Sequence, residues 1–159
     1  MLDKKIFYVT KEKLKQLKKE HDDLVVFEHN KLSGQEAPRM MESEDINPEF
    51  VSYQEDMTSL RNRIDELKTI LDNYELIKNP PKEHQTAVGV GATVKLETSG
   101  QKAEFVIMGT LEANPELGHI SNESPVGKAL IGHKVGDEVM VDSPEKTKYK
   151  IKGIKYEIS

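Results

Sequence analysis

The chain has 159 residues and a formal net charge of −5 at pH 7, and it contains no cysteine. Disulfides and thiolate metal sites are therefore excluded. The negative charge argues against tight, nonspecific binding to bare duplex DNA, although a local basic patch could still contact a nucleic acid held by another protein.

Hydrophobic residues make up 36% of the chain and charged residues 32%. The chain is too polar to form one large hydrophobic core, and its apolar residues are too regularly spaced for a disordered protein. We therefore expect an elongated molecule. The first residues lack the apolar core of a signal peptide, and no apolar run approaches the roughly 20 residues that span a bilayer. We therefore expect a cytoplasmic protein that does not bind a membrane. We also expect it to be a monomer.

The first long helix is predicted to begin after Thr10, whose hydroxyl can cap the first turn. Apolar residues then recur at alternating spacings of three and four, which is typical of a helix facing a partner helix. The stripe consists of Leu14, Leu17 and Leu24, with His21 between them. Gly34 and Pro38 resist regular helix, so we expect this helix to weaken near Ser33.

A second helix is predicted to start with Asn47 as its cap and Pro48 in the first helical position. Its stripe follows the same rhythm through Tyr53, Met57, Leu60, Ile64, Leu67, Leu71, Tyr74 and Ile77. We expect Leu60 and Ile64 in the seam and Asp65 in solvent. Neither helix can bury its stripe alone, so the two are predicted to pack antiparallel as a coiled-coil hairpin over residues 1–78.

The prolines at positions 80 and 81 are predicted to end the second helix, with a linker over residues 79–90. Strand patterns follow over residues 93–97, 103–108, 137–142 and 149–158. In the last strand the apolar residues occupy odd-numbered positions before Gly153 and even-numbered positions after it, which predicts a β-bulge. Ser124 and Pro125 open a short helix that Gly132 closes. Residues 91–159 are therefore predicted to form a small antiparallel sheet with one helix, which makes the chain α+β.

The segment Ile120–Gly132 reads Ile-Ser-Asn-Glu-Ser-Pro-Val-Gly-Lys-Ala-Leu-Ile-Gly. It resembles the C-terminal domain of the GreA/GreB transcription elongation factors. Gly136–Val139 and Gly91–Val94 continue the match, and the hairpin, the linker and the total length agree with it. The resemblance covers essentially the whole chain, and its Ser-Pro-x-Gly-x-Ala-Leu-x-Gly pattern is specific.

The resemblance implies an FKBP-like C-terminal domain that docks on the largest subunit of bacterial RNA polymerase, at the rim of the secondary channel. The corner formed by Glu123, Ser124 and Pro125 would carry this contact. The hairpin would enter the channel, and a basic patch that includes Arg61 and Arg63 would hold the 3′ end of the RNA. Such a protein is not an enzyme itself: the polymerase hydrolyses the backtracked RNA.

Acidic residues at the hairpin tip are implied to help hold a Mg²⁺ ion that is bound mainly by the polymerase. Carboxylate oxygen is a preferred ligand of this hard cation. The tip acids are Glu36, Glu42, Glu44, Asp45, Glu49, Glu55 and Asp56, with Arg39 among them. Glu44 and Asp45 are the best candidates, with Glu42 third. A solvated acidic loop without a metal is the other interpretation.

The tip departs from the usual family sequence, Gly-Asp-Leu-Lys-Glu-Asn-Ala-Glu-Tyr. Ser43 stands at the usual aspartate position and Ile46 at the usual glutamate position. A channel-occupying regulator that inhibits the polymerase without cleavage is therefore an alternative function. A peptidyl-prolyl isomerase is a third hypothesis, but the second half has no tryptophan and few aromatic residues to line a proline pocket.

Two further readings of the charged residues stay open. Lys11, Lys13, Lys15, Lys18 and Lys19 crowd the first arm, either as part of the RNA-binding patch or as ordinary helix-surface charge. The histidines at 29, 84, 119 and 133 show no metal-ligand spacing.

Overall fold

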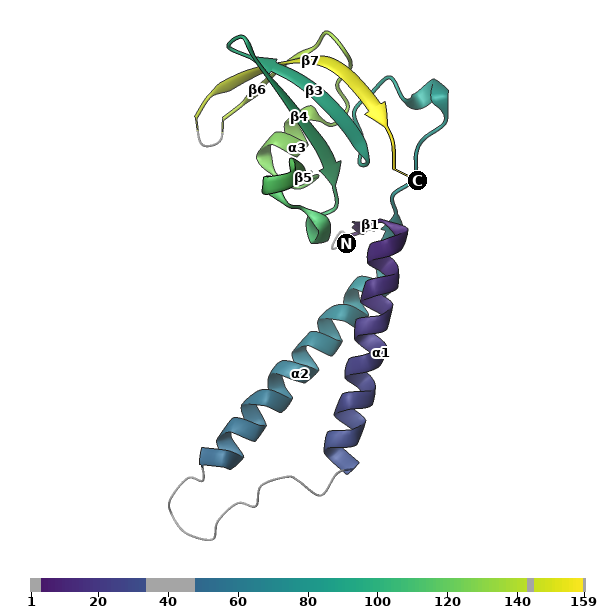
Figure 1. Ribbon diagram of the computed structural model, residues 1–159, viewed down its shortest axis with the longest axis vertical. Coiled ribbons are helices and arrows are strands. Elements are labelled where there is room, and N and C mark those ends of the chain that lie inside the picture. Colours follow the sequence, from purple (N-terminus) through teal and green to yellow (C-terminus); the bar gives the residue numbers. More distant parts are fainter. Residues whose placement is uncertain (1–3, 34–47, 143–144, 159) are drawn as a thin grey trace. The chain divides into compact units, whose positions relative to one another are not determined.

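The computed structural model describes residues 4–33, 48–142 and 145–158 (Figure 1). The chain divides into two compact units. One is a helical hairpin over residues 14–73, and the other combines residues 1–13 with residues 74–159. In this division residues 1–13 and 74–78, which the prediction includes in the hairpin, are grouped with the sheet.

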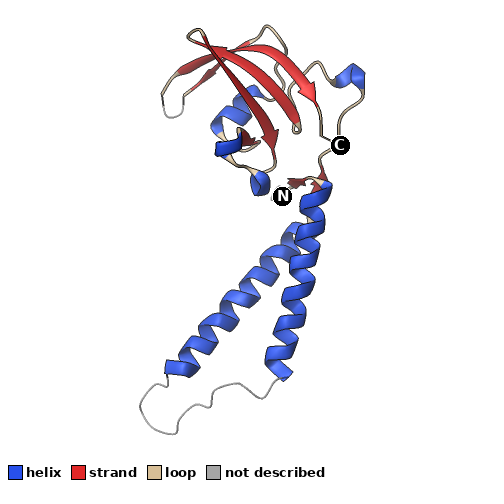
Figure 2. Cartoon of the chain, in the orientation of Figure 1, coloured by secondary structure: helices blue, strands red, loops and turns tan. Residues whose placement is uncertain are grey.

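Two long helices form the hairpin: α1 (Lys11–Ser33) and α2 (Pro48–Asp72) (Figure 2). Thr10 accepts a hydrogen bond from the Lys13 N–H at its hydroxyl, 3.2 Å away, which confirms the predicted cap. The end of α1 at Ser33 and the start of α2 at Pro48 also agree with prediction. The predicted cap residue Asn47 lies outside the described residues.

The apolar stripes are buried only in part. Leu14 and Leu17 are buried on α1, and Met57, Leu67 and Ile70 on α2. Leu60 and Ile64 are half-buried, while Asp65 is exposed as predicted. The two helices diverge toward the tip in Figure 1. Beyond Leu24 the remaining large apolar side chains of α1 are accordingly exposed: Val25, Val26, Phe27 and Leu32.

The prediction that the α2 stripe continues through Tyr74 and Ile77 is wrong. The helix ends at Asp72, and Tyr74–Leu76 form strand β2, which pairs in parallel with β1 (Phe7–Val9). Ile77 donates its N–H to the Val9 carbonyl at 2.9 Å and lies buried against Gly91. The helix therefore ends well before the two prolines that were predicted to stop it.

The second unit contains, besides the β1–β2 pair, a five-stranded sheet with the order β5-β4-β3-β7-β6. The strands are β3 (Ala92–Thr98), β4 (Gln101–Met108), β5 (His119–Ser121), β6 (Glu138–Val141) and β7 (Thr147–Tyr156). Helix α3 (Pro125–Leu130) contributes Leu130 to the buried core beside Val94, Leu96, Ile107 and Ile151. The predicted α+β class is confirmed.

The sheet is mixed rather than wholly antiparallel. The pairs β3–β4, β3–β7 and β6–β7 are antiparallel, as predicted, whereas β4 and β5 are parallel. Strand β5 has this direction because the chain between β4 and β5 crosses over through two short 3₁₀ turns, Thr110–Glu112 and Pro115–Leu117.

The predicted bulge at Gly153 is confirmed. Lys95 of β3 pairs with Gly153, but its neighbour Leu96 pairs with Ile151, so one residue of β7 is extra. The extra residue places both Ile151 and Ile154 on the core side of the sheet. The bulge therefore explains why the apolar residues of this strand change from odd-numbered to even-numbered positions.

We expect Leu67→Ala to lower the free energy of unfolding by about 2–5 kcal/mol, because the Leu67 side chain is fully buried. Leu60→Ala is the matched control and should lower it less, since Leu60 is only half-buried. Urea unfolding followed by circular dichroism measures both. Equal losses for the two variants would contradict this description of the seam.

Candidate functional site

The motif Ser-Pro-x-Gly builds a tight corner between β5 and α3. The Ser124 hydroxyl donates to the Ser121 carbonyl at 2.6 Å and accepts from the Gly127 N–H at 3.1 Å. A Cβ at position 127 would lie 2.1 Å from the Ser121 oxygen, so only glycine fits there. Pro125 occupies the first turn of α3 and is exposed. Ser124 therefore shapes the corner, and Pro125 is its accessible surface.

Glu123 is held in place beside this corner. Its N–H donates to the Ser121 hydroxyl at 3.0 Å, and its carboxylate accepts a 2.8 Å hydrogen bond from the Thr110 hydroxyl. The Lys5 ammonium lies 3.5 Å from the same carboxylate oxygen. The Thr110 hydrogen bond and the Lys5 charge lower the pKa of Glu123. Its exposed carboxylate therefore presents a fixed negative charge to solvent.

The N-terminal strand β1 packs against the same part of the unit. The Gly109 backbone lies so close to Tyr8 that a Cβ at position 109 would stand 1.7 Å from the Tyr8 oxygen. The Glu112 carboxylate accepts hydrogen bonds from the Thr10 N–H at 2.9 Å and the Thr10 hydroxyl at 2.6 Å. Sequence reasoning missed these contacts and the Lys5–Glu123 pair, because each joins residues more than 90 positions apart.

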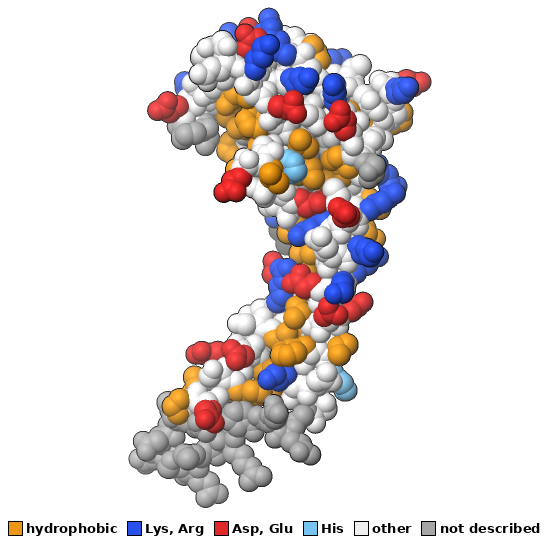
Figure 3. Space-filling view, in the orientation of Figure 1, with side chains coloured by type: hydrophobic (Ala, Val, Ile, Leu, Met, Phe, Trp, Pro, Cys, Tyr) orange, Lys and Arg blue, Asp and Glu red, His pale blue; other side chains and the backbone are white. Residues whose placement is uncertain are grey.

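Charged side chains of both signs line the hairpin (Figure 3). Arg63 on α2 makes two hydrogen bonds to Glu20 on α1, at 2.7 and 3.0 Å, and one to Glu66 at 3.1 Å. The hydrogen bonds to Glu20 are the largest cause of a raised Arg63 pKa. Arg61 lies 3.5 Å from Glu28. Both predicted RNA-binding arginines are therefore paired with carboxylates of the opposite helix.

The predicted metal-binding tip residues Glu42, Glu44 and Asp45 lie outside the described residues, as do Ser43 and Ile46. Of the remaining tip acids, Glu55 and Asp56 lie exposed on α2. Within residues 4–33, 48–142 and 145–158, no group of three or more histidines and acids is placed to hold a metal ion. The Mg²⁺ assignment therefore rests on the sequence alone.

Neither α1, α2 nor any other helix in the described part of the chain is both long and apolar enough to cross a membrane.

Comparison with known proteins gives one family. A model described as "Transcription elongation factor, GreA/GreB, C-term" matches residues 82–156. Transcription elongation factor GreA of Thermomicrobium roseum is 36% identical over 143 residues, which cover 87% of this chain and 90% of the relative. GreA of Mycoplasma genitalium is 35% identical over 153 residues, which cover 93% and 94%.

Among solved structures, GreA factor homolog 1 of Thermus thermophilus is similar at 23% identity over 95% of this chain and 99% of that one. The TM-score of 0.42 is too low to support an argument about function. The sequence relatives, by contrast, match over nearly their full length at more than 30% identity. The chain therefore belongs to the GreA/GreB family of transcription elongation factors.

Proposed function

We propose that this chain binds bacterial RNA polymerase at the rim of the secondary channel and stimulates cleavage of backtracked RNA. The observation that carries the proposal is the corner of Glu123, Ser124 and Pro125, which hydrogen bonds hold in place and which exposes Glu123 and Pro125. The relatives named transcription elongation factor GreA support a role in transcription elongation. Such a factor acts as a monomer in the cytoplasm, where the polymerase works.

Each of the three corner residues would have a different role in binding to the largest subunit of the polymerase. Pro125 offers a rigid apolar contact, and Glu123 offers a carboxylate for a cation or an N–H donor of the partner. The Ser124 hydroxyl is already used inside the corner, so its role is to hold the other two in position. Preorganisation of this kind raises affinity because less conformational entropy is lost on binding.

The tip acids would act on a metal ion that the polymerase holds. Mg²⁺ at that position activates water and stabilises the negative charge that develops on the phosphate. Glu44 and Asp45, with Glu42 in support, would contribute carboxylate oxygens toward it. The chain has no hydrolytic step of its own in this proposal, and the nuclease activity belongs to the polymerase.

Contact with the 3′ end of the RNA is proposed for Arg61 and Arg63. Each guanidinium would have to leave a carboxylate on α1 in order to bind a phosphate. The exposed Arg61 makes one ion pair, which contributes only about 0–1 kcal/mol, so a phosphate with its higher charge can compete for it. Arg63 makes two hydrogen bonds to Glu20, so its transfer to a phosphate would cost more.

A second candidate function is favoured by one observation in the sequence. Ser43 and Ile46 occupy the positions where family tips usually carry aspartate and glutamate. If the neighbouring acids do not reach the metal, the hairpin would occupy the channel and inhibit the polymerase without cleavage.

We expect Pro125→Arg to weaken polymerase binding about tenfold or more, which corresponds to at least about 1.4 kcal/mol. A long cation would replace a rigid apolar contact at the centre of the proposed interface. Because Pro125 is exposed, the melting temperature of the variant should stay unchanged. The measurement is competition for the polymerase against labelled unmutated protein.

Val135→Arg is the control, because it adds the same charge at another exposed apolar position. It should leave the affinity for the polymerase unchanged. Equal affinities of the two variants would reject the docking corner.

A further inference from the structure

The strands of the second unit are basic although the chain as a whole is acidic. Strands β3, β4, β6 and β7 carry six lysines and three glutamates, in a chain of net charge −5. The lysines are Lys95, Lys102, Lys148, Lys150, Lys152 and Lys155, and the glutamates are Glu97, Glu104 and Glu138. Positive charge is therefore concentrated on this sheet.

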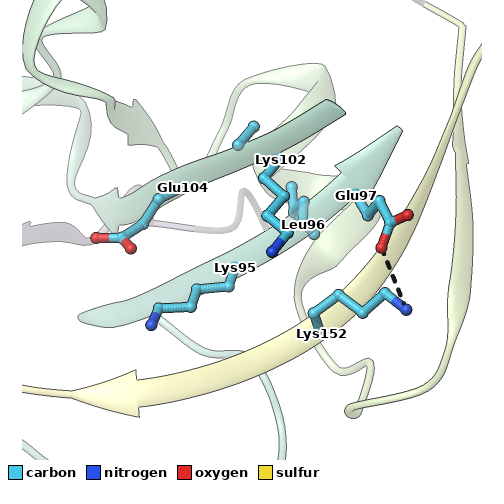
Figure 4. Close-up of a pocket in the computed structure, with 7 residues that line it drawn as sticks. Lys95, Leu96, Glu97, Lys102, Glu104 and Lys152 are labelled. Atoms are coloured by element: carbon cyan, nitrogen blue, oxygen red, sulfur yellow. Dashed lines mark ion pairs between the residues drawn. The ribbon is translucent and has the colours of Figure 1, made fainter. Parts of the chain in front are cut away.

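The lysines gather on the side of the sheet away from the core. All six are exposed, and they alternate along the strands with core residues such as Val94, Leu96 and Ile151. Figure 4 shows Lys95, Lys102 and Lys152 rising from β3, β4 and β7, with Glu97 and Glu104 among them. We call the outer side of β3, β4 and β7 the lysine face.

The bulge in β7 brings its far end into the lysine face. Lys150 and Lys155 differ by an odd number of positions and would point to opposite sides of a regular strand. The extra residue at the bulge restores them to one side, and both are exposed. Gly153 lies beside Lys95 on this side of the sheet, because a Cβ at position 153 would be at ordinary contact distance, 3.7 Å, from the Lys95 side chain.

Most of the lysines remain available to a partner. Lys152 pairs with Glu97 at 3.2 Å, and Lys148 pairs with Glu138 at 2.8 Å. Within the described residues, no carboxylate lies within 4.0 Å of the ammonium groups of the other four lysines: Lys95, Lys102, Lys150 and Lys155. Glu104 is the one glutamate of these strands that has no lysine within that distance.

The chemistry of the lysine face fits phosphate better than protein. Among the described residues, no large hydrophobic side chain of β3, β4 or β7 is exposed. Protein partners generally require an apolar centre in an interface, whereas nucleic-acid interfaces are polar and strongly positive. Neighbouring strands are about 4.8 Å apart and alternate residues about 6.8 Å apart, so one extended backbone can reach several lysines.

We propose that the lysine face binds the phosphate backbone of a nucleic acid without reading its sequence. Lysine binds phosphate as a point charge, and the described residues on this face include no aromatic side chain on which bases could stack. The contact lies on the unit that does not contain the hairpin, and it goes beyond the proposed function. Its affinity should fall steeply with salt, by about 0.7 in logarithmic slope for each phosphate contacted on a single strand.

The test is fluorescence anisotropy of labelled 20-nucleotide oligo(U) and oligo(dT) with the whole chain, at KCl concentrations of about 50–200 mM. Lys95→Gln, Lys102→Gln and Lys155→Gln are combined in one variant, which should fold normally because all three side chains are exposed. Its affinity at the lowest salt should fall by on the order of tenfold or more, and its salt slope by about 2. Similar results with both oligonucleotides would show that the contact is to phosphate.

The control combines Lys68→Gln, Lys78→Gln and Lys82→Gln, three exposed lysines that lie outside the lysine face. It changes the net charge equally and should lose much less affinity. Equal or larger losses in the control would overturn the proposal, as would no oligonucleotide binding by the unmutated chain. Unchanged oligonucleotide affinity together with weaker polymerase binding would assign the face to an acidic protein instead. Because the oligonucleotide assay contains no polymerase, its failure is separate from a failure of the proposed docking.

Discussion

Changing Glu44 and Asp45 together to alanine should slow cleavage of backtracked RNA by on the order of a hundredfold, equivalent to about 2.7 kcal/mol in the activation barrier. The two carboxylates are the proposed extra ligands of a metal ion that the polymerase otherwise holds. Affinity for the polymerase should stay nearly unchanged, because docking is assigned to the other unit. Raising Mg²⁺ should partly rescue each single variant, since mass action offsets one lost ligand.

The matched control is Glu55→Ala combined with Asp56→Ala. It removes the same two residue types from exposed positions on α2. This variant should cleave at the unmutated rate in the same assay of RNA length on a gel. Equal losses in the two double variants would show that general negative charge, rather than a ligand at the tip, supports cleavage.

The second large effect is expected from Gly109→Ala, which should lower the free energy of unfolding of the second unit by about 1–3 kcal/mol or more. The new Cβ would stand 1.7 Å from the Tyr8 carbonyl oxygen, and a backbone atom has little freedom to move aside. The backbone of Gly109 is in an ordinary extended conformation, so the cost comes from space alone. Strand β1 should be displaced, and its amides should exchange with solvent faster.

Gly153→Ala tests whether any glycine of the sheet unit would have the same effect. Its new Cβ would meet only the Lys95 side chain at ordinary contact distance, so its stability should be close to that of the unmutated chain. Urea unfolding measures the stability of both variants, and hydrogen exchange measures β1. If Gly109→Ala were as stable as Gly153→Ala and kept β1 protected, the seating of the N-terminal strand would be misassigned.

Features that depend only on residues close together in the sequence could be predicted. Thr10 and Ser124 cap helices because each hydroxyl reaches an N–H three residues ahead. The bulge at Gly153 followed from two apolar sets of opposite parity on one strand. The Ser-Pro-x-Gly corner was recognisable because its geometry depends on neighbouring residues only.

Features that join distant segments could not be predicted. Strands β1 and β2 have three residues each, too few to show a period, and they pair across more than 60 positions. Tyr74 and Ile77 continued the helical rhythm although β2 and the sheet unit use them instead. The Arg63–Glu20 pair could not be predicted either, because the sequence does not indicate which residue of the opposite helix a charged side chain will contact.

The most direct test of the proposed function is to add the purified, unmutated protein to a stalled and backtracked bacterial RNA polymerase complex with labelled RNA. We expect the RNA to be shortened at its 3′ end and elongation to resume when nucleotides are supplied. Full-length RNA together with slower elongation would contradict cleavage stimulation. That result would support the inhibitory function, with Ser43 and Ile46 at the family's acidic positions as its natural explanation.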